Sequence, residues 1–148
     1  MSYVKMRAAG AVLATISACS IFFASPASAA EYDGVNPDTS SCNNTATTVK
    51  SASVANYQGV KVGTVELRYS TACRTVWVRT IGPVATADGS GMVGYVVRNS
   101  DGKTYGADYR SGTTKWSKML NDVGVTSYAK AFDDNGEGAG ATARTGNY

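Results

Sequence analysis

The chain has 148 residues, with 14 lysines and arginines, 11 aspartates and glutamates, and no histidine. The absence of histidine excludes Ser-His-Asp and Cys-His catalytic arrangements and the common zinc sites, and it removes the usual side chain for acid–base catalysis near neutral pH. No run of basic residues is present, so we do not expect a nucleic-acid partner.

The N-terminus has the organisation of a secretory signal peptide. Lys5 and Arg7 form a positive start, and residues 8–24 are an almost uncharged apolar run. Small residues follow, with Ala27 and Ala29 in the A-x-A arrangement that precedes cleavage. The apolar run is too short and too rich in alanine and serine for a membrane span. The pattern predicts cleavage after Ala29.

The predicted division of the chain is a signal peptide over residues 1–29 and one secreted, extracellular domain over residues 30–148. A second interpretation is a lipoprotein cleavage box at residues 16–19, which would leave a lipidated Cys19 at the cell surface. Because the apolar core continues past that cysteine, we prefer cleavage after the later alanine. We expect the exported domain to be a monomer.

Export also decides the state of the cysteines. Removal of the signal peptide leaves Cys42 and Cys73, an even pair in a compartment where disulfides persist. We therefore predict a disulfide between them, which closes a loop of about 30 residues and contributes about 3–4 kcal/mol in the chain-entropy model. A nucleophilic thiol or a metal thiolate would require a free cysteine.

The mature chain begins with a loop-rich segment, because residues 30–48 carry many Gly, Pro, Asp and Asn residues. Residues 47–54 then read as a strand, with Val49 and either Ala52 or Val54 facing inward.

Residues 60–81 are predicted to form the central hairpin. Val65, Leu67 and Tyr69 alternate with Glu66 and Arg68, as in a half-buried strand, and residues 74–81 are rich in β-branched and aromatic residues. The small polar residues 70–72 suit the turn, and a crosslink at Cys73 would attach the hairpin to another part of the chain.

The second half of the chain also reads as strands joined by turns. Asn99 to Gly102 is a turn signal that joins a second hairpin over residues 92–110. Val93, Tyr95 and Val97 share one face of its first strand. Residues 116–120 are compatible with a strand or one helical turn. Further strands are predicted at residues 126–132 and 139–148, separated by a turn at residues 133–138.

Short strands with turn signals every 8–12 residues or so, and no helical stripe, predict an all-β single domain: a small antiparallel β-barrel or sandwich with one disulfide.

Several motifs of the chain resemble a known family. They are Tyr32-Asp33-Gly34, Asn36-Pro37, Cys42, the run Val65 to Ser70, then Cys73, Thr75, Trp77 and Arg79, with Trp116 to Leu120 and Ala141 to Gly146. With these residues the chain is similar to the secreted bacterial domain of unknown function numbered 2690, the YjfA-like family. The resemblance implies a secreted, disulfide-bonded β domain. It implies no activity and carries no catalytic residues.

A carboxylate pair is the main enzymatic option that remains without histidine. Glu66 could be one member, and the other would be Asp88, Asp108 or Asp122. The alternative is structural, because Glu66 can pair across strands with Arg68, Arg79 or Lys103, as is common on exposed sheet faces.

Two acidic loops, residues 33–38 and 133–137, could bind calcium, yet neither follows the twelve-residue helix-flanked pattern, and such residues also form tight turns without a metal. No metal or other cofactor is predicted.

The aromatic residues provide the remaining functional signal, because aromatic side chains suit sugar and peptide ligands. We expect Trp77 in the core beside the disulfide, and we place a candidate binding surface at Trp116, Tyr105 and Tyr109. Two functions stay open. The first is a non-enzymatic secreted domain that binds an extracellular partner, either a cell-wall glycan or a protein. The second is a small secreted hydrolase that uses carboxylates.

Overall fold

The computed structural model describes residues 31–56, 58–82, 91–107, 114–134 and 142–148. The predictions for the signal peptide, Cys19, Tyr109, Asp88 and Asp108 lie outside these residues. Within them, no helix is both long enough and apolar enough to cross a membrane.

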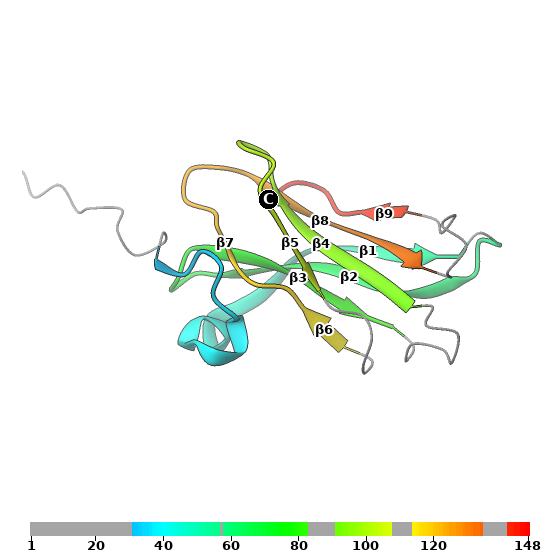
Figure 1. Ribbon diagram of the computed structural model, residues 1–148, viewed down its shortest axis with the longest axis horizontal. Coiled ribbons are helices and arrows are strands. Elements are labelled where there is room, and N and C mark those ends of the chain that lie inside the picture. Colours follow the sequence, from blue (N-terminus) through cyan, green and yellow to red (C-terminus); the bar gives the residue numbers. More distant parts are fainter. Residues whose placement is uncertain (1–30, 57, 83–90, 108–113, 135–141) are drawn as a thin grey trace, which may run out of the picture.

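Strands dominate the described chain (Figure 1). Two short 3-10 helices, η1 and η2, precede the first strand. The elements are η1 (Pro37–Thr39), η2 (Ser41–Thr45), β1 (Ala46–Ala55), β2 (Lys61–Ser70), β3 (Thr75–Ile81), β4 (Gly91–Arg98), β5 (Thr104–Ala107), β6 (Thr114–Trp116), β7 (Leu120–Asn121), β8 (Ser127–Asp134) and β9 (Thr142–Arg144).

The strands form two antiparallel sheets that pack as a sandwich (Figure 1). The first sheet has the order β1-β2-β3-β6, with β7 also paired to β3, and the second has the order β5-β4-β8-β9. The prediction of an all-β disulfide-bonded domain is confirmed, and of its two forms the sandwich is the correct one. No described strand belongs to both sheets, and the chain passes from one sheet to the other in its connections.

The core lies between the sheets. The first sheet contributes Val65 and Leu67 of β2 with Val76 and Val78 of β3, and all four are fully buried. The second sheet contributes Met92, Val96, Ala129 and Ala131. The inward face of β2 therefore follows the predicted alternation, although Tyr69 is only half-buried.

The two sheets approach each other closely at Gly94. A Cβ atom on this glycine would lie 2.3 Å from Thr80 Cγ2 and 3.2 Å from Val78 Cγ2. Met92, Gly94 and Val96 thus form the inward face of β4. Val93, Tyr95 and Val97 share a face, as predicted, and that face is the outer one.

A register shift in β1 explains its irregular pattern. The pairing with β2 moves from Thr48 opposite Arg68 to Lys50 opposite Leu67, which leaves Val49 as the extra residue of a β-bulge. The bulge turns Val49 toward the core while Lys50 stays exposed. Ala52 and Val54 both pack inward, so the two alternatives for this strand are both realised.

Three predicted boundaries were wrong in detail. Asp133 and Asp134 belong to β8 and not to a turn, because they pair with Met92 and Gly91 of β4. The last strand is shorter than predicted and covers Thr142–Arg144. The ambiguous stretch near Trp116 is neither one strand nor a helical turn: β6 ends at Trp116 and β7 begins at Leu120, and residues 117–119 cross the edge of β3 between them.

Candidate functional site

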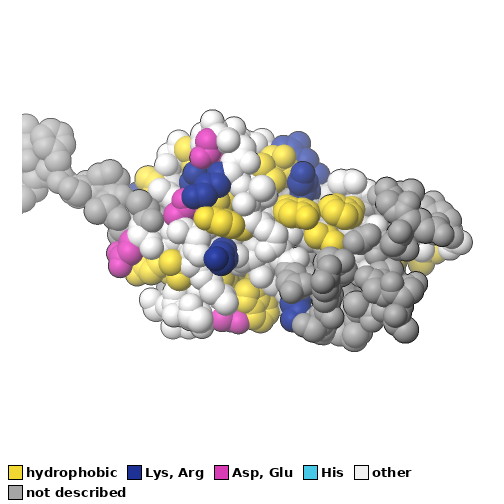
Figure 2. Space-filling view, viewed as in Figure 1, with side chains coloured by type: hydrophobic (Ala, Val, Ile, Leu, Met, Phe, Trp, Pro, Cys, Tyr) yellow, Lys and Arg dark blue, Asp and Glu magenta, His cyan; other side chains and the backbone are white. Residues whose placement is uncertain are grey.

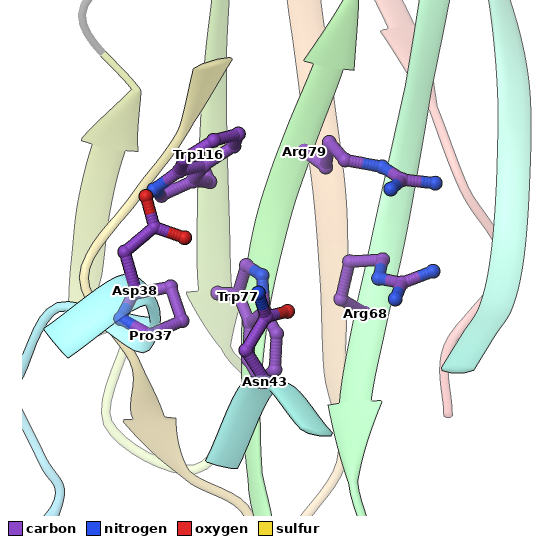
Figure 3. Close-up of a pocket in the computed structure, with 7 residues that line it drawn as sticks. All are labelled: Pro37, Asp38, Asn43, Arg68, Trp77, Arg79 and Trp116. Atoms are coloured by element: carbon purple, nitrogen blue, oxygen red, sulfur yellow. The ribbon is translucent and has the colours of Figure 1, made fainter. Parts of the chain in front are cut away.

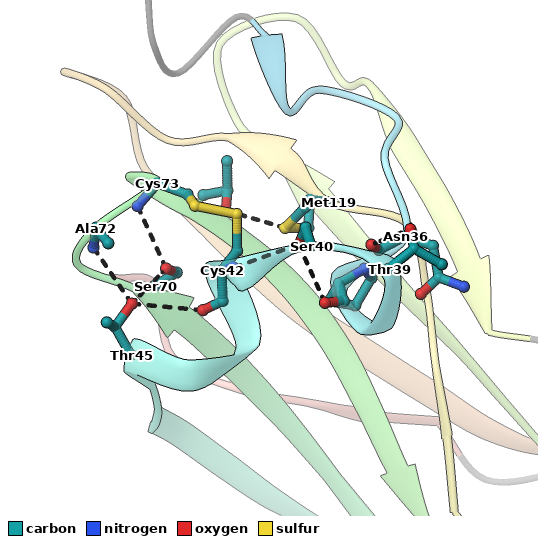
Figure 4. The surroundings of a disulfide bond; sticks show 11 residues. Asn36, Thr39, Ser40, Cys42, Thr45, Ser70, Ala72, Cys73 and Met119 are labelled. Atoms are coloured by element: carbon teal, nitrogen blue, oxygen red, sulfur yellow. Dashed lines mark hydrogen bonds between the residues drawn. A yellow bond between two sulfur atoms is a disulfide. The ribbon is translucent and has the colours of Figure 1, made fainter.

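The predicted disulfide is present. Cys42 of η2 is bonded to Cys73 in the turn after β2, with 5.5 Å between their Cα atoms. Around the bond lie Trp77, 2% exposed, and the fully buried Met119, which form a second apolar cluster with the two cysteines. Figure 4 shows Met119 beside the bond. The cluster covers the outer face of the first sheet. Trp77 is therefore core beside the disulfide, as predicted.

Hydrogen bonds around the disulfide hold η2 against the central hairpin (Figure 4). The hydroxyls of Thr45 and Ser70 lie 2.8 Å apart, and the Cys73 amide donates to Ser70 Oγ at 3.3 Å. The Thr75 hydroxyl is 3.2 Å from Met119 Sδ. The covalent link is therefore supported by polar contacts on both sides of the turn.

Local sequence also shapes the two 3-10 helices. Asn36 Oδ1 accepts a hydrogen bond from the Asp38 amide at 3.0 Å, and Pro37 occupies the first turn, where a missing N–H costs little. Ser40 caps η2 by accepting from the Cys42 amide at 3.4 Å. The turn signals in the N-terminal segment thus fix two helical turns on top of the sheet.

These elements close a small cavity on the outer face of the first sheet, which we call the Trp116 pocket (Figure 3). Its volume is about 50 Å³. Strands β2, β3 and β6 and both 3-10 helices supply the lining. The lining residues are Pro37, Asp38, Asn43, Arg68, Trp77, Arg79 and Trp116.

Trp116 is the exposed aromatic residue of the pocket, with 36% of its surface accessible. It lies opposite Arg79 in the ladder between β6 and β3, so the two side chains share the outer face. The Asp38 side chain extends toward the indole in Figure 3. Because Trp77 is buried within the lining, the pocket has one fixed aromatic wall and one accessible one.

Two arginines give the pocket its polar character. Arg79 binds Glu66 through Nε at 2.7 Å and Nη2 at 2.6 Å. Arg68 donates from Nη1 to Thr48 Oγ1 at 2.7 Å and from Nη2 to the Ala46 carbonyl at 3.0 Å. Burial, together with the charge of Arg79, lowers the pKa of Arg68, and Glu66 partly offsets this. Both guanidinium groups are held in place by the protein.

The carboxylate candidates are placed apart in the described structure. Glu66 pairs with Arg79, which is one of the structural pairings that we considered for it, and it also accepts from Thr48 Oγ1 at 3.2 Å. Asp122 accepts from Ser127 Oγ at 2.6 Å, and burial raises its pKa to about 6. The contacts of these two acids share no residue.

The first acidic loop is occupied by structural contacts. Asp33 Oδ2 binds Lys103 Nζ at 2.7 Å and lies 3.9 Å from Arg98 Nη1, and Asn36 caps η1. Among the described residues, no cluster of three Cys, Asp or Glu side chains has metal-binding geometry. The second loop lies largely outside these residues.

The predicted surface is divided by the fold. Tyr105 lies on β5 of the second sheet, where it packs against the inter-sheet core, and its ring has Lys103 Nζ 5.5 Å from its centroid. Trp116 lies on the first sheet. Tyr109 is outside the described residues, so its part in a binding surface stays a prediction.

Sequence reasoning missed Asp38, Asn43, Arg68 and Arg79 as neighbours of Trp116. One signal was available for Asn43, because a Cys42–Cys73 bond must bring this residue to the hairpin. The pairing of β6 with β3 could not be predicted, because β6 has only three residues and so carries no clear alternation.

The fold and the site define a disulfide-bonded β-sandwich domain with an Arg- and Trp-lined pocket on one sheet face. The chain belongs to the family described as "Protein of unknown function (DUF2690)", whose family model matches residues 30–140. It is similar to "Uncharacterized protein YjfA" of Bacillus subtilis (strain 168), with 31% identity over 107 residues, which cover 66% of this chain and 68% of that relative. No solved structure matches the chain.

Proposed function

We propose that this chain is an exported, non-catalytic domain that binds a cell-wall glycan at the Trp116 pocket. The observation that carries the proposal is the accessible indole of Trp116 on a sheet face that also carries two immobilised arginines, of which Arg79 lies directly opposite Trp116 in the ladder. Export is supported by the N-terminal signal pattern and by the disulfide, which is typical of proteins in oxidising compartments.

The chemistry of the lining suits a hydroxyl-rich ligand. Each sugar hydroxyl both donates and accepts hydrogen bonds, and the pocket lining includes the Asp38 acceptor and the Asn43 amide, which does both. The guanidinium groups of Arg68 and Arg79 extend away from Trp116 on the same face, toward their own partners (Figure 3). An aromatic ring presents a flat apolar face with which the C–H face of a sugar can stack. A polar pocket with one exposed ring therefore matches a sugar better than an apolar ligand.

A glycan also fits better than a protein partner. Stable protein interfaces bury about 800 Å² on each partner around an apolar centre. The exposed large hydrophobic residues of the described chain are few. Ile81 and Trp116 lie near each other on β3 and β6, with one register pair between theirs, whereas Val60 and Tyr148 lie outside the strands. A pocket of about 50 Å³ accommodates one substituent of a sugar, and neighbouring surface would contact the rest of the chain.

The fold prepares the pocket for binding. The disulfide and its hydrogen bonds fix η2, and the ion pair with Glu66 fixes Arg79. Ordering of side chains on binding costs about 0.5–1.5 kcal/mol each, so groups that are already held reduce this cost.

The hydrolase alternative has less support. An acid–base pair would need two carboxyl groups that flank one bond. Glu66 is engaged by Arg79 and Thr48, while Asp122 contacts a different set of residues.

The test measures retention on isolated cell walls and release of soluble sugar in the same samples. The exported protein is compared with Trp116→Ala, Glu66→Gln and Val60→Ala, the last as a control because Val60 is 57% exposed and outside the pocket. We expect Trp116→Ala to reduce retention, Val60→Ala to keep it, and no sugar to be released. Sugar release that Glu66→Gln abolishes would establish the hydrolase instead.

A further inference from the structure

The outer face of the second sheet carries a separate group of aromatic and basic side chains. The register places Tyr95 opposite Gly106 on one side and opposite Lys130 on the other, with Lys130 opposite Arg144. We call this surface the tyrosine face. Its outward residues are Tyr95, Val97, Thr104, Gly106, Tyr128, Lys130, Phe132, Thr142 and Arg144.

Tyr95 and Phe132 form an aromatic platform on this face. Tyr95 and Phe132 are stacked, with centroids 6.1 Å apart and an interplanar angle of 20°. A Cβ atom on Gly106 would lie 3.0 Å from Tyr95 Cε1, so the absence of a side chain there lets the tyrosine ring lie across β5. The ring is therefore held by its neighbours and still borders open surface.

A shallow hollow adjoins the platform. Its volume is about 180 Å³, and Tyr95, Val97, Gly102, Thr104 and Lys130 line it. It combines an aromatic ring, a hydroxyl and an ammonium group within one open depression.

The charged side chains described on this face are basic. Lys130 Nζ lies 5.8 Å from the Tyr95 ring centroid, and the Arg144 guanidinium lies 3.8 Å from that of Tyr128. Among the outward side chains that the structure describes, none is a carboxylate. The acid in the adjacent turn, Asp101, is paired with Arg98 at 2.6 Å. Figure 2 shows lysine and arginine side chains beside both hydrophobic and acidic ones on the side of the molecule in view. The positive charge of Lys130 and Arg144 favours an anionic ligand.

We propose that the tyrosine face is a second binding site, which takes an anionic polysaccharide. A sugar ring stacks on Tyr95, and its carboxylate or phosphate group binds Lys130, with Arg144 extending the positive surface along the polymer. A single-stranded nucleic acid is a poorer fit, because it presents one phosphate per nucleotide to a longer basic groove. This site is independent of the Trp116 pocket, so either can exist without the other.

The test uses the full exported protein and measures dissociation constants by affinity electrophoresis. The probes are polygalacturonate, which carries carboxylates, a glycerol-phosphate wall polymer, neutral dextran and single-stranded oligothymidine. The variants are Lys130→Gln and Tyr95→Ala, with Lys61→Gln as a matched control because Lys61 is an exposed lysine on the other sheet. Trp116→Ala separates this site from the pocket.

We expect one or both anionic glycans to bind more tightly than dextran, with about tenfold weaker binding in Lys130→Gln and in Tyr95→Ala. Lys61→Gln should bind as the parent does, binding of the anionic glycans should persist in Trp116→Ala, and binding should weaken with added salt. Equal binding by Lys130→Gln, no binding of either anionic glycan, or tighter binding of oligothymidine would overturn the proposal. Lys130→Gln alone decides if Tyr95→Ala does not fold.

Discussion

Trp116 lies directly opposite Arg79 in the ladder that joins β6 to β3, and Arg79 in turn is paired with Glu66 of β2. Strands β2, β3 and β6 therefore fix the position of the exposed Trp116 indole relative to the Arg79–Glu66 ion pair. This relation depends on β6, which has three residues and is bordered by buried Ser117. Ser117 Oγ accepts from the Val78 amide at 3.2 Å, and its own amide donates to the Val78 carbonyl at 3.0 Å.

Removal of the disulfide should weaken both the fold and the pocket. We expect Cys42→Ala with Cys73→Ala to lower the free energy of unfolding by about 3–4 kcal/mol in urea denaturation, because the bond closes a loop between residues 31 positions apart. Retention on cell walls should fall as well, since η1 and η2 supply three lining residues.

The same bond can be checked in natively exported protein. A non-reduced digest should contain the peptides of Cys42 and Cys73 linked to each other. Two free thiols in that material would contradict this account of how the N-terminal segment is attached.

Leu67→Ala should destabilise the domain by about 2–5 kcal/mol, because this side chain is fully buried between the sheets and its truncation leaves a cavity. Leu67→Met is the control, since it nearly conserves volume and should cost less than about 1.5 kcal/mol. Denaturant titration measures both. An alanine variant as stable as the parent would mean that β2 does not face the core.

Much of the fold was readable from local pattern. Strict alternation at Val65 and Leu67 identified the buried face of β2, and the even cysteine count identified the crosslink. Val93 and Tyr95 show the limit of this reasoning, because alternation tells which residues share a face and not which face is covered. The covered face of β4 is the one that carries Gly94, because this glycine allows the close approach of the other sheet. A glycine has no side chain, so it contributes nothing to a hydrophobic pattern.

The candidate site was less predictable. Arg68, Arg79 and Trp116 come together only through the pairing of β2, β3 and β6, and Asp38 joins them through the fold of the N-terminal segment. Pairing of strands far apart in sequence depends on tertiary packing, which residue spacing does not encode.

Gly94→Ala should destabilise the domain through overpacking, whereas Leu67→Ala does so by leaving a cavity. The added methyl group would meet Thr80 Cγ2 at 2.3 Å, so the sheets would have to separate locally. We expect a loss of about 1–3 kcal/mol in the free energy of unfolding. The matched control is Gly146→Ala, where the nearest atom would be 3.9 Å away, and it should be nearly neutral. Similar costs for both variants would contradict the close approach at Gly94.

Asp122 should make stability depend on pH. Burial raises its pKa to about 6, although the Ser127 hydroxyl and the Arg98 charge act in the opposite direction. In the unfolded chain an aspartate has a pKa of about 3.9. Between about pH 4 and pH 6 the folded state therefore holds a proton that the unfolded state releases, so stability from this group is full below about pH 4 and is lost as pH rises.

Asp122→Asn tests this dependence. We expect the free energy of unfolding to lose this decline and to rise by about 1–2 kcal/mol at pH 7, a figure reduced for the partial solvent exposure of the carboxyl group. Asp101→Asn is a control in which the change in stability should have the opposite sign, because the hydrogen bond from Arg98 lowers the pKa of Asp101. A parent protein whose stability, after correction for other acids, does not decline over this range would contradict the assignment.

The central claim, that the Trp116 pocket binds wall glycan, can be tested directly by tryptophan fluorescence. The chain has two tryptophans; Trp77 is buried, and Trp116 is accessible. Titration with solubilised wall glycan should shift and quench the emission of the parent protein, and Trp116→Phe, which retains only the emission of the buried Trp77, should show a much smaller change. An equal change in Trp116→Phe, or none in the parent, would contradict the claim.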